Sequence, residues 1–448
     1  MTKNIDLTTG SPFSQLILFS LPLVASSIFQ QFYNFIDTLI IGRLLGVQSL
    51  AAVGIYYPLS FLILGFIQGS CVGFTIPLAQ SIGAKNELDS KRYITSGTII
   101  CTILALIITP LMIGFTPQML TLLNTPSDIF KLAVIFSTVS FIGIPANILY
   151  NYSTNILRSF GDSIHPFYFL LGSLILNIAL DLIFILVFHL GIASVALATV
   201  ISEFAAGILN VLYLIFHDEI ANFLDLRMKV PFQYIKRVCY VGFPMGLEYS
   251  VSAIGAVLLQ DAINQLGTMA VAAQSAGDKI RQLFTLPMES VGMSIATYTA
   301  QNFGSKNIAR IKAGIKSGII IQGGYSLISL LVILVTKHWL IATVIGTTRG
   351  TVYAKTDQYL TTISFFFLLH GLLMIFRNTI QGLGYSMYAI ISGMGELIGR
   401  ACAGYLAVAG WGFTAICYSN QLAWSLALLY CLFMTWWLFQ HSAKLSIA

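Results

Sequence analysis

Long apolar runs, separated by short polar or Gly/Pro-rich breaks, fill almost the whole of this 448-residue sequence. A helix that crosses the hydrocarbon core of a membrane needs about 20 mostly apolar residues. Runs of that length predict twelve transmembrane helices, near 14–38, 51–75, 94–115, 131–153, 166–188, 192–216, 238–261, 271–295, 314–335, 357–380, 385–408 and 412–438. The run at 271–295 is the weakest, because Asp278, Lys279 and Arg281 lie inside it. The sequence therefore predicts an all-α membrane protein.

The low content of charged residues supports the same class of protein. Charged residues make up 9% of the chain and hydrophobic residues 57%, whereas an ordinary soluble domain is about 25% charged. This composition excludes a water-soluble enzyme of this size and a disordered chain. The net charge of +6 is too diluted to predict a nucleic-acid partner. The partner that the composition predicts is the lipid bilayer.

The basic residues between the apolar runs predict the orientation, because cytoplasmic loops carry an excess of Lys and Arg. If both termini are inside, the outer loops hold Arg43, Lys131, Lys337, Arg349 and Lys355 of the 23 Lys and Arg residues. Lys279, Arg281 and Arg400 lie within predicted helices. All the others, Arg377 among them, fall in inner loops and tails. We therefore expect a multi-pass protein of the cell (inner or plasma) membrane with both termini in the cytoplasm.

An internal repeat organises the chain. The segment AQSIGAKN at 79–86 recurs as AQNFGSKN at 300–307, which is 221 residues later, or about half the chain. Six helices in each repeat make both halves enter the membrane in the same direction. They are then related by a pseudo-two-fold axis along the membrane normal. The prediction is an N-terminal lobe at 1–216, a polar cytoplasmic linker at 217–237 and a C-terminal lobe at 238–448, with binding between or within the lobes.

Two aspartates lie inside predicted helices of the first lobe. An ionisable side chain inside a membrane span is costly, so each one is a candidate functional group. Asp37 comes late in the first helix and Asp181 late in the fifth, and both helices run outward. Thr199 comes early in the sixth helix, and Asn177 shares a helix face with Asp181. These four residues offer hard oxygen ligands for Na⁺, or two carboxylates that share a proton.

Polar side chains also hydrogen-bond helices together in membrane bundles, and this is the alternative for the same four residues. Such a structural role does not need a charge, so the two aspartates favour ion coupling. Glu203, four residues after Thr199, is a candidate for extending a proton relay or for binding a cationic substrate. Pro22 precedes Asp37 in the first helix and is a candidate hinge, with a static kink as the alternative.

The second lobe differs chemically from the first, because the repeat places Arg400 where the first lobe has Asn177. Glu248 lies within the seventh helix without a local partner and is a candidate for recognising a cationic substrate. Glu396 and Arg400 are one turn apart and are interpreted as an i,i+4 pair that neutralises itself, although Arg400 is also a candidate substrate contact.

Asp278 and Arg281 of the eighth predicted helix are interpreted as a structural pair near a helix end. Other chemistries lack their signatures, since there is no GxxxxGK[ST], HExxH or GxSxG motif and the six His residues are scattered. We therefore expect no enzyme activity and no cofactor, with H⁺ or Na⁺ as the coupling ion. A membrane-embedded lipid enzyme is an alternative without a nucleophile and base pairing to support it.

Several segments, taken jointly and in order, resemble the MATE (multidrug and toxic compound extrusion) family, in its DinF/MepA-like branch. They are SLPLVASSIFQQFYNFIDTLIIGRLLGVQSLAAVG, AQSIGAKN, NILRSFGDSIHPFYF, LNIALDLIFI, GFPMGLEYS and AQNFGSKN. The resemblance implies a two-lobed, twelve-helix exporter driven by H⁺ or Na⁺. It implies that Asp37, Asn177, Asp181 and Thr199 bind the ion, as metal ligands if the ion is Na⁺, and that Pro22 matches the family's first-helix proline. It also implies that Gln30, Tyr33 and Asn34 line the cavity beside Asp37.

The sequence departs from that branch at Glu203, which is not a standard ligand, and at Glu248, where many relatives carry Gln. The predicted function is a secondary active multidrug efflux transporter, working as a monomer, that antiports small cationic or amphipathic compounds against H⁺ or Na⁺ by alternating access. The candidate substrate contacts are Gln30, Tyr33, Asn34, Glu203, Glu248 and Arg400. The alternative is a flippase for a lipid-linked precursor, which would favour a large basic cavity.

Overall fold

The structure is a computed structural model that describes residues 5–225 and 228–441, and this described part is helical and contains no strand. Lys3, Arg227 and Lys444, which belong to the predicted inner side, lie outside the described residues. The first repeat comprises α1 (Pro12–Ile40), the π-helix η1 (Ile41–Leu45), α2 (Gly46–Gly83), α3 (Glu87–Leu122), α4 (Ser127–Ile142), α5 (Ile144–Ser159), α6 (Ile164–Leu186) and α7 (Ala193–Phe216). The short helix α8 (Asp218–Ala221) follows in the linker.

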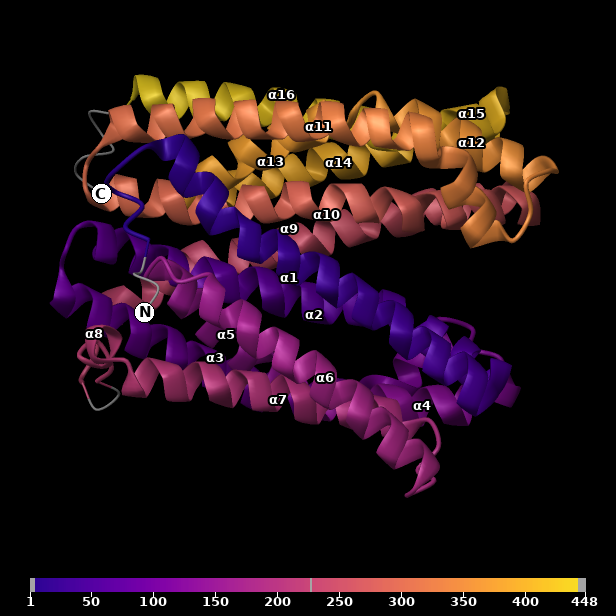
Figure 1. Ribbon diagram of the computed structural model, residues 1–448, viewed down its shortest axis with the longest axis horizontal. Helices are drawn as coiled ribbons and strands as arrows, with labels where there is room; N and C mark the ends of the chain where they lie inside the picture. Colours follow the sequence, from indigo (N-terminus) through magenta and orange to yellow (C-terminus); the bar gives the residue numbers. More distant parts are fainter. Residues whose placement is uncertain (1–4, 226–227, 442–448) are drawn as a thin grey trace. The chain divides into compact units, whose positions relative to one another are not determined.

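The second repeat has the same order of long helices. It comprises α9 (Phe232–Gln265), α10 (Thr268–Gly304), α11 (Ile308–Ile345), α12 (Thr351–Ser364), α13 (Phe367–Gly382), α14 (Ser386–Leu406), the π-helix η2 (Ala407–Trp411), α15 (Gly412–Cys417) and α16 (Ser419–Gln440). Figure 1 shows α6 beside α7 in the first repeat and α14 along α16 in the second, and both pairs are in contact. Each of the twelve predicted helices corresponds to one helix or to consecutive helices of the structure.

Length and apolarity identify seven membrane-spanning helices in the described part of the chain, or nine if each bent pair is one span. One of the seven is the continuous stretch 12–83, which contains both α1 and α2. The bent pairs are α4 with α5, at 42°, and α12 with α13, at 50°. Helix α10 is long enough but is not among these spans, because charged residues interrupt its apolar sequence, as they do in the predicted run 271–295.

The repeated motif that ends in Lys-Asn forms the same turn in both repeats. Lys85 and Lys306 have the positive backbone angles φ 55° and φ 58°, which reverse the chain after a helix. The following asparagine then caps the next helix: Asn86 accepts a hydrogen bond from the amide of Asp89 at 3.1 Å, and Asn307 from that of Arg310 at 2.9 Å. The motif therefore recurs because it starts α3 and α11.

The chain divides into two compact units whose boundaries differ from the predicted lobes. Unit 1 comprises Met1–Asp6 and Ala25–Gly246, and unit 2 comprises Leu7–Val24 and Leu247–Ala448. Helix α1 thus begins in unit 2 and ends in unit 1, and α9 does the reverse. The crossing points come two residues after Pro22 and Pro244, which lie inside these helices. The predicted lobes did not divide α1 or α9 between them. A sequence repeat gives the order of the helices along the chain, but it does not show which helices are in contact.

Arg310 holds the start of the exchanged segment inside unit 2. Its guanidinium donates to the carbonyls of Leu7 (3.1 and 3.2 Å) and Gly10 (2.7 Å), to the carbonyl of Thr9, and to Oε1 of Gln15 (2.6 Å). The Leu7 side chain is fully buried. One arginine at the start of α11 therefore fastens the residues that precede and begin α1.

Replacing Arg310 by alanine is expected to lower the free energy of unfolding by about 1–3 kcal/mol, because charged hydrogen bonds to backbone carbonyls are lost. The melting temperature of the purified protein should fall, and limited proteolysis near Gly10 should become faster. Lys316, an exposed basic residue on the same helix, gives the matched control Lys316→Ala. Equal stability of the two variants would contradict this role of Arg310.

Unit 1 holds the first half of α9 by a different set of contacts. Tyr234 donates its hydroxyl to Oδ1 of Asp89 at 2.6 Å and accepts from Nη1 of Arg92 at 2.7 Å. A Cβ atom on Gly73 of α2 would lie 2.6 Å from the Cα atom of Gly242, so glycine permits the close approach of these helices. The exchanged half of α9 is therefore packed against α2 and α3 inside unit 1.

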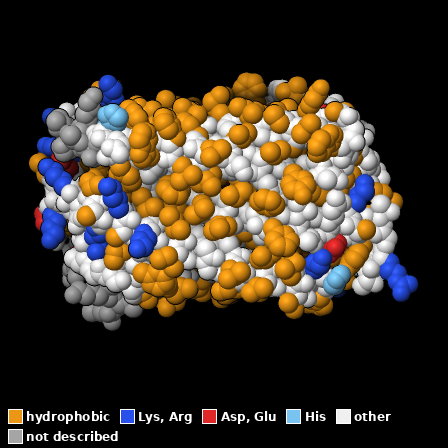
Figure 2. Space-filling view, turned by 90° about the horizontal axis from the view of Figure 1, so that it is seen from above, with side chains coloured by type: hydrophobic (Ala, Val, Ile, Leu, Met, Phe, Trp, Pro, Cys, Tyr) orange, Lys and Arg blue, Asp and Glu red, His pale blue; other side chains and the backbone are white. Residues whose placement is uncertain are grey.

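Figure 2 shows a face whose middle is covered by hydrophobic side chains, while Lys and Arg side chains gather toward its left end. Exposed side chains on the long helices include Leu106, Ile175, Val335 and Leu429. An apolar exterior of this kind matches lipid rather than water as the surrounding medium.

Candidate ion and substrate sites

The polar cluster of the first repeat is built around Thr199 of α7. Its hydroxyl donates to the carbonyl of Val195 at 2.9 Å, so its oxygen accepts from other partners. Those partners are the hydroxyl of Tyr33 in α1, at 2.8 Å, and the amide of Asn177 in α6, at 3.4 Å. Three helices of unit 1 therefore meet at one hydroxyl group, and Tyr33 and Asn177 are oriented by it.

The two aspartates lie next to each other, and one of them is in contact with Tyr33. Asp37 interacts directly with both Asp181 and Tyr33. Asp181 is fully buried and Asn177 is 1% exposed. The structure therefore brings together the four residues that the sequence singled out as ion ligands, together with Tyr33.

Several oxygens of the cluster have no hydrogen-bond partner within the described residues. They are Oδ1 of Asp37, Oδ1 of Asn177 and both carboxylate oxygens of Asp181. A buried polar atom without a partner is costly, and two neighbouring carboxylates repel each other when both are charged. A proton shared between the carboxylates would relieve both costs, and so would a small cation bound by these oxygens.

The cluster does not have the composition of a transition-metal site. No group of three or more His, Cys, Asp or Glu side chains placed to hold a metal occurs in residues 5–225 and 228–441. The available donors are carboxylate, amide and hydroxyl oxygens, which suit hard ions such as Na⁺ or a proton.

The remaining candidates of the first repeat lie on α1 and α7. Gln30 and Asn34 have exposed side chains on α1. Glu203 accepts from the amide of Asn147 in α5, at 3.3 and 3.4 Å, and it interacts electrostatically with Tyr33. Asn147 was not among the predicted site residues. It has no charge, so the sequence carried no signal that it would face Glu203.

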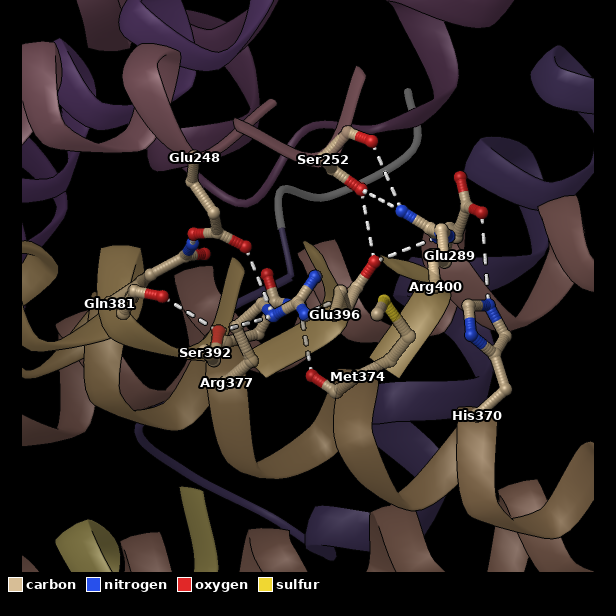
Figure 3. A network of polar contacts seen from close by, with 12 residues as sticks. Glu248, Ser252, Glu289, His370, Met374, Arg377, Gln381, Ser392, Glu396 and Arg400 are labelled. Carbon is tan, nitrogen blue, oxygen red and sulfur yellow. Dashed lines mark hydrogen bonds and ion pairs between the residues drawn. The ribbon is translucent and has the colours of Figure 1, made fainter. Parts of the chain in front are cut away.

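The second repeat contains an ion-pair network in place of an oxygen cluster (Figure 3). Nε of Arg377 lies 3.0 Å from Oε1 of Glu248, and Nη2 of Arg377 pairs with Oε1 of Glu396. Arg400 pairs with the other oxygen of Glu396 at 2.9 Å. Ser252 donates to that oxygen at 2.9 Å. Two arginines thus balance two glutamates inside unit 2.

One prediction about this network was wrong, and one predicted site residue has partners that are distant in sequence. Glu248 has a charged partner in Arg377 and a second partner in Gln381, which donates to Oε2 at 2.7 Å. Arg377 lies inside α13, 9% exposed, and not in an inner loop. The error arose because the count of loop charges took residues near the end of a predicted helix as loop. Glu248 and Glu396 are buried, so each charged carboxylate requires a positive partner, and Arg377 forms an ion pair with both.

The two pairs predicted from local spacing are present. Glu396 and Arg400 form the i,i+4 pair described above. Asp278 and Arg281 form an ion pair at 2.9 Å, and Asp278 also accepts from the hydroxyl of Tyr359 in α12, at 2.7 Å. Asp278 comes ten residues after the first residue of α10, so this pair lies within the helix and not near its end.

Two helical repeats with buried polar groups inside apolar helices define a multi-pass membrane transport protein. The MatE family model matches residues 22–183 and 244–406, so the chain belongs to the MATE family of transporters, which are not enzymes. The two matched segments cover corresponding parts of the two repeats.

The chain is similar to named relatives over most of its length. It is 28% identical over 389 residues to the probable multidrug resistance protein YpnP of Bacillus subtilis (strain 168), covering 87% of this chain and 86% of that protein. It is 24% identical over 388 residues to the multidrug export protein MepA of Staphylococcus haemolyticus (strain JCSC1435), covering 86% and 85%.

A solved structure shows the same fold over the full length. It is the outward-facing conformation of a multidrug resistance MATE family transporter of the MOP superfamily. The TM-score is 0.90 at 21% identity, and the match covers 100% of both chains.

Proposed function

We propose that this protein is a secondary active efflux transporter that antiports cationic or amphipathic small molecules against H⁺ or Na⁺. The observation that carries the proposal is the contact between Asp37 and Asp181, whose oxygens lack hydrogen-bond partners among the described residues. The names of YpnP and MepA, both described as multidrug proteins, support drugs as substrates. The basic residues Lys229, Lys236 and Arg237 of the predicted linker support its cytoplasmic placement.

The proposed mechanism is alternating access driven by the charge of the cluster. H⁺ or Na⁺ enters from outside and binds between Asp37 and Asp181, which removes their repulsion. The ion shifts the protein between two states only to the extent that it binds one state more tightly. By reciprocal linkage, substrate released outward favours ion binding, and ion release inside favours reloading of substrate.

Pro22 is the proposed hinge, because α1 passes from unit 2 to unit 1 two residues after it. Asp37 lies in the part of α1 that belongs to unit 1, so a change of charge there acts on a helix whose first half belongs to unit 2. Gln30, Tyr33, Asn34 and Glu203 are proposed substrate contacts in the first repeat. We further propose that the protein acts as a monomer in the cell membrane with both termini inside.

Glu248 and Arg400 are weaker substrate contacts than the sequence suggested. Each is engaged by an opposite charge in the network of unit 2, and separating a buried pair costs several kcal/mol. The same pairing neutralises the arginines that a flippase for an anionic lipid would use. The structure therefore favours the efflux transporter over the flippase.

The test is efflux of ethidium from proteoliposomes under a controlled gradient. Collapse of the proton gradient by a protonophore, or of the Na⁺ gradient by a sodium ionophore, is expected to stop uphill efflux. The ionophore that has this effect identifies the coupling ion. Uphill efflux that continues without either gradient would overturn the proposal.

A further inference from the structure

A cavity of about 390 Å³ lies within unit 2, and none of the residues that line it belongs to the ion-pair network of Figure 3. Its walls come from α14, η2, α15 and α16, with Phe366 added from the junction of α12 and α13. Figure 1 shows α15 next to α12 at the right end of this repeat, and the two helices are in contact. The volume falls within the range of sites for small organic molecules, about 300–1,000 Å³.

The break between α14 and α15 shapes one wall of this cavity. Gly410 of η2 and Gly412, which follows η2, have φ angles of 120° and 58°, and glycine adopts such angles without strain. Trp411 stands between them and lines the cavity. The rings of Phe366 and Tyr418 also line it, with their centroids 6.4 Å apart. The break therefore brings three aromatic side chains around one cavity, and π-helical turns of this kind are frequent at functional sites.

Gln421 of α16 is the polar residue that sets this cavity apart from a packing defect. It lines the cavity and is 4% exposed, and neither Oε1 nor Nε2 has a hydrogen-bond partner within the described residues. The two polar residues before it are satisfied: Ser419 donates to the carbonyl of Ile416 at 2.8 Å, and Asn420 donates to the hydroxyl of Tyr359 at 3.2 Å. A buried amide without partners is costly, so this one points to a ligand that supplies both a donor and an acceptor.

The composition of the walls limits the class of ligand. None of the described residues that line the cavity is charged, and an unpaired ion is costly against apolar walls. Ala403, Leu406, Ala415 and Leu422 give these walls hydrocarbon surface, whereas a buried water molecule needs two to four polar partners. A primary amide matches Gln421, because each carboxamide carries both an N–H donor and a carbonyl acceptor. The favoured ligand is therefore uncharged, with one amide group and an apolar body.

Exposed side chains mark the mouth of the cavity. Trp411, Tyr418 and Leu422 line it and are also exposed on the surface. Trp and Tyr are enriched where a membrane protein meets the boundary between lipid and water. In the orientation proposed above, α14 runs outward, so η2 and α15 lie at its outer end. A ligand would therefore enter from the outer leaflet of the bilayer.

We propose that this cavity binds an uncharged amphipathic molecule, of which a medium-chain primary amide is the simplest example. Its amide group pairs with Gln421, and its apolar body lies against the rings of Phe366, Trp411 and Tyr418. The site differs from the cluster of Asp37 in that no charge is bound or exchanged there. The inference does not rest on the proposed antiport function, because it uses residues of neither polar site described above.

The test is photoaffinity labelling of the purified protein in nanodiscs with decanamide that carries a diazirine on its chain. Mass spectrometry should locate the label on the lining segments of α14, α15 and α16, and excess unmodified decanamide should suppress it. Gln421→Leu should reduce the labelling about tenfold, which is the usual effect of losing uncharged hydrogen bonds to a ligand. The matched control is Gln260→Leu, which changes an exposed glutamine of α9 and should leave the labelling unchanged.

Further measurements separate this site from a lost fold and from lipid chains. Gln421→Leu should melt at a higher temperature than wild type, because it removes a buried amide without partners. Ala415→Leu narrows the cavity and should weaken labelling of the folded protein. The methyl ester of the same chain cannot donate a hydrogen bond and should label more weakly than the amide. Equal labelling by ester and amide, or unchanged labelling of Gln421→Leu, would contradict the proposed site. No gradient is used, so failure here is distinct from failure of coupled efflux.

Discussion

Replacing Asp37 by asparagine is expected to uncouple substrate efflux from the ion gradient. Asparagine keeps the size of the side chain and its contact with Tyr33, but it cannot exchange a proton, and it binds Na⁺ without a charge. The reciprocal effect of ion and substrate, usually about 5- to 150-fold, should then disappear. In proteoliposomes, addition of ethidium should no longer drive proton or Na⁺ movement, and uphill efflux should stop.

The control for this variant is Asp261→Asn, which changes an exposed aspartate of α9 and should leave coupling intact. Asp181→Asn should uncouple transport as Asp37→Asn does. The double variant should be no worse than either single one, because the carboxylates act as a pair. Normal coupled efflux by a folded Asp37→Asn protein would contradict the proposal that this cluster binds the coupling ion.

Replacing Arg377 by leucine is expected to destabilise the protein by about 3–5 kcal/mol, because it leaves a buried glutamate without its charged partner. Glu248 would keep only the hydrogen bond from Gln381, whereas Glu396 would keep Arg400. Thermal unfolding in detergent should begin at a lower temperature than in wild type. Ethidium efflux should fall with the amount of folded protein.

A second substitution distinguishes lost charge balance from lost packing. Adding Glu248→Gln to Arg377→Leu removes the unpaired charge and should recover part of the lost stability. The exposed residue Arg349 provides the control Arg349→Leu, which should be near neutral. A double variant as unstable as Arg377→Leu alone would show that the charge of Glu248 is not the cause.

Much of the fold was predictable, because each segment carries its own signal. A membrane span must satisfy its backbone hydrogen bonds internally, so each long apolar run specifies a helix regardless of its neighbours. The weak run at 271–295 was predicted through the repeat, and α10 covers it. The bends between α4 and α5 and between α12 and α13 were not predicted. Pro145 follows the break at Gly143 but was not interpreted as a helix boundary, and no charge or proline marks the break at Phe365.

The candidate ion site was predictable for a related reason. Asp37 and Asp181 are costly wherever they stand inside a span, so their positions along the chain already indicate function. The predicted depth of each residue rests on the direction of its helix. The pairing of Arg377 with Glu248 was not predictable, since the two are 129 residues apart in sequence and nothing in either segment specifies which helices become neighbours.

The sequence by itself determined the class of protein, the order of the long helices and which buried charges stand out, because these depend on local hydrophobicity and on the cost of charge in lipid. Only the tertiary structure decided which charges meet. The first half of α1 belongs to unit 2 and the first half of α9 to unit 1. Arg377 neutralises Glu248, and Glu289 faces His370. Ion pairing acts over a few ångströms between helices, and that distance is a property of packing and not of sequence order.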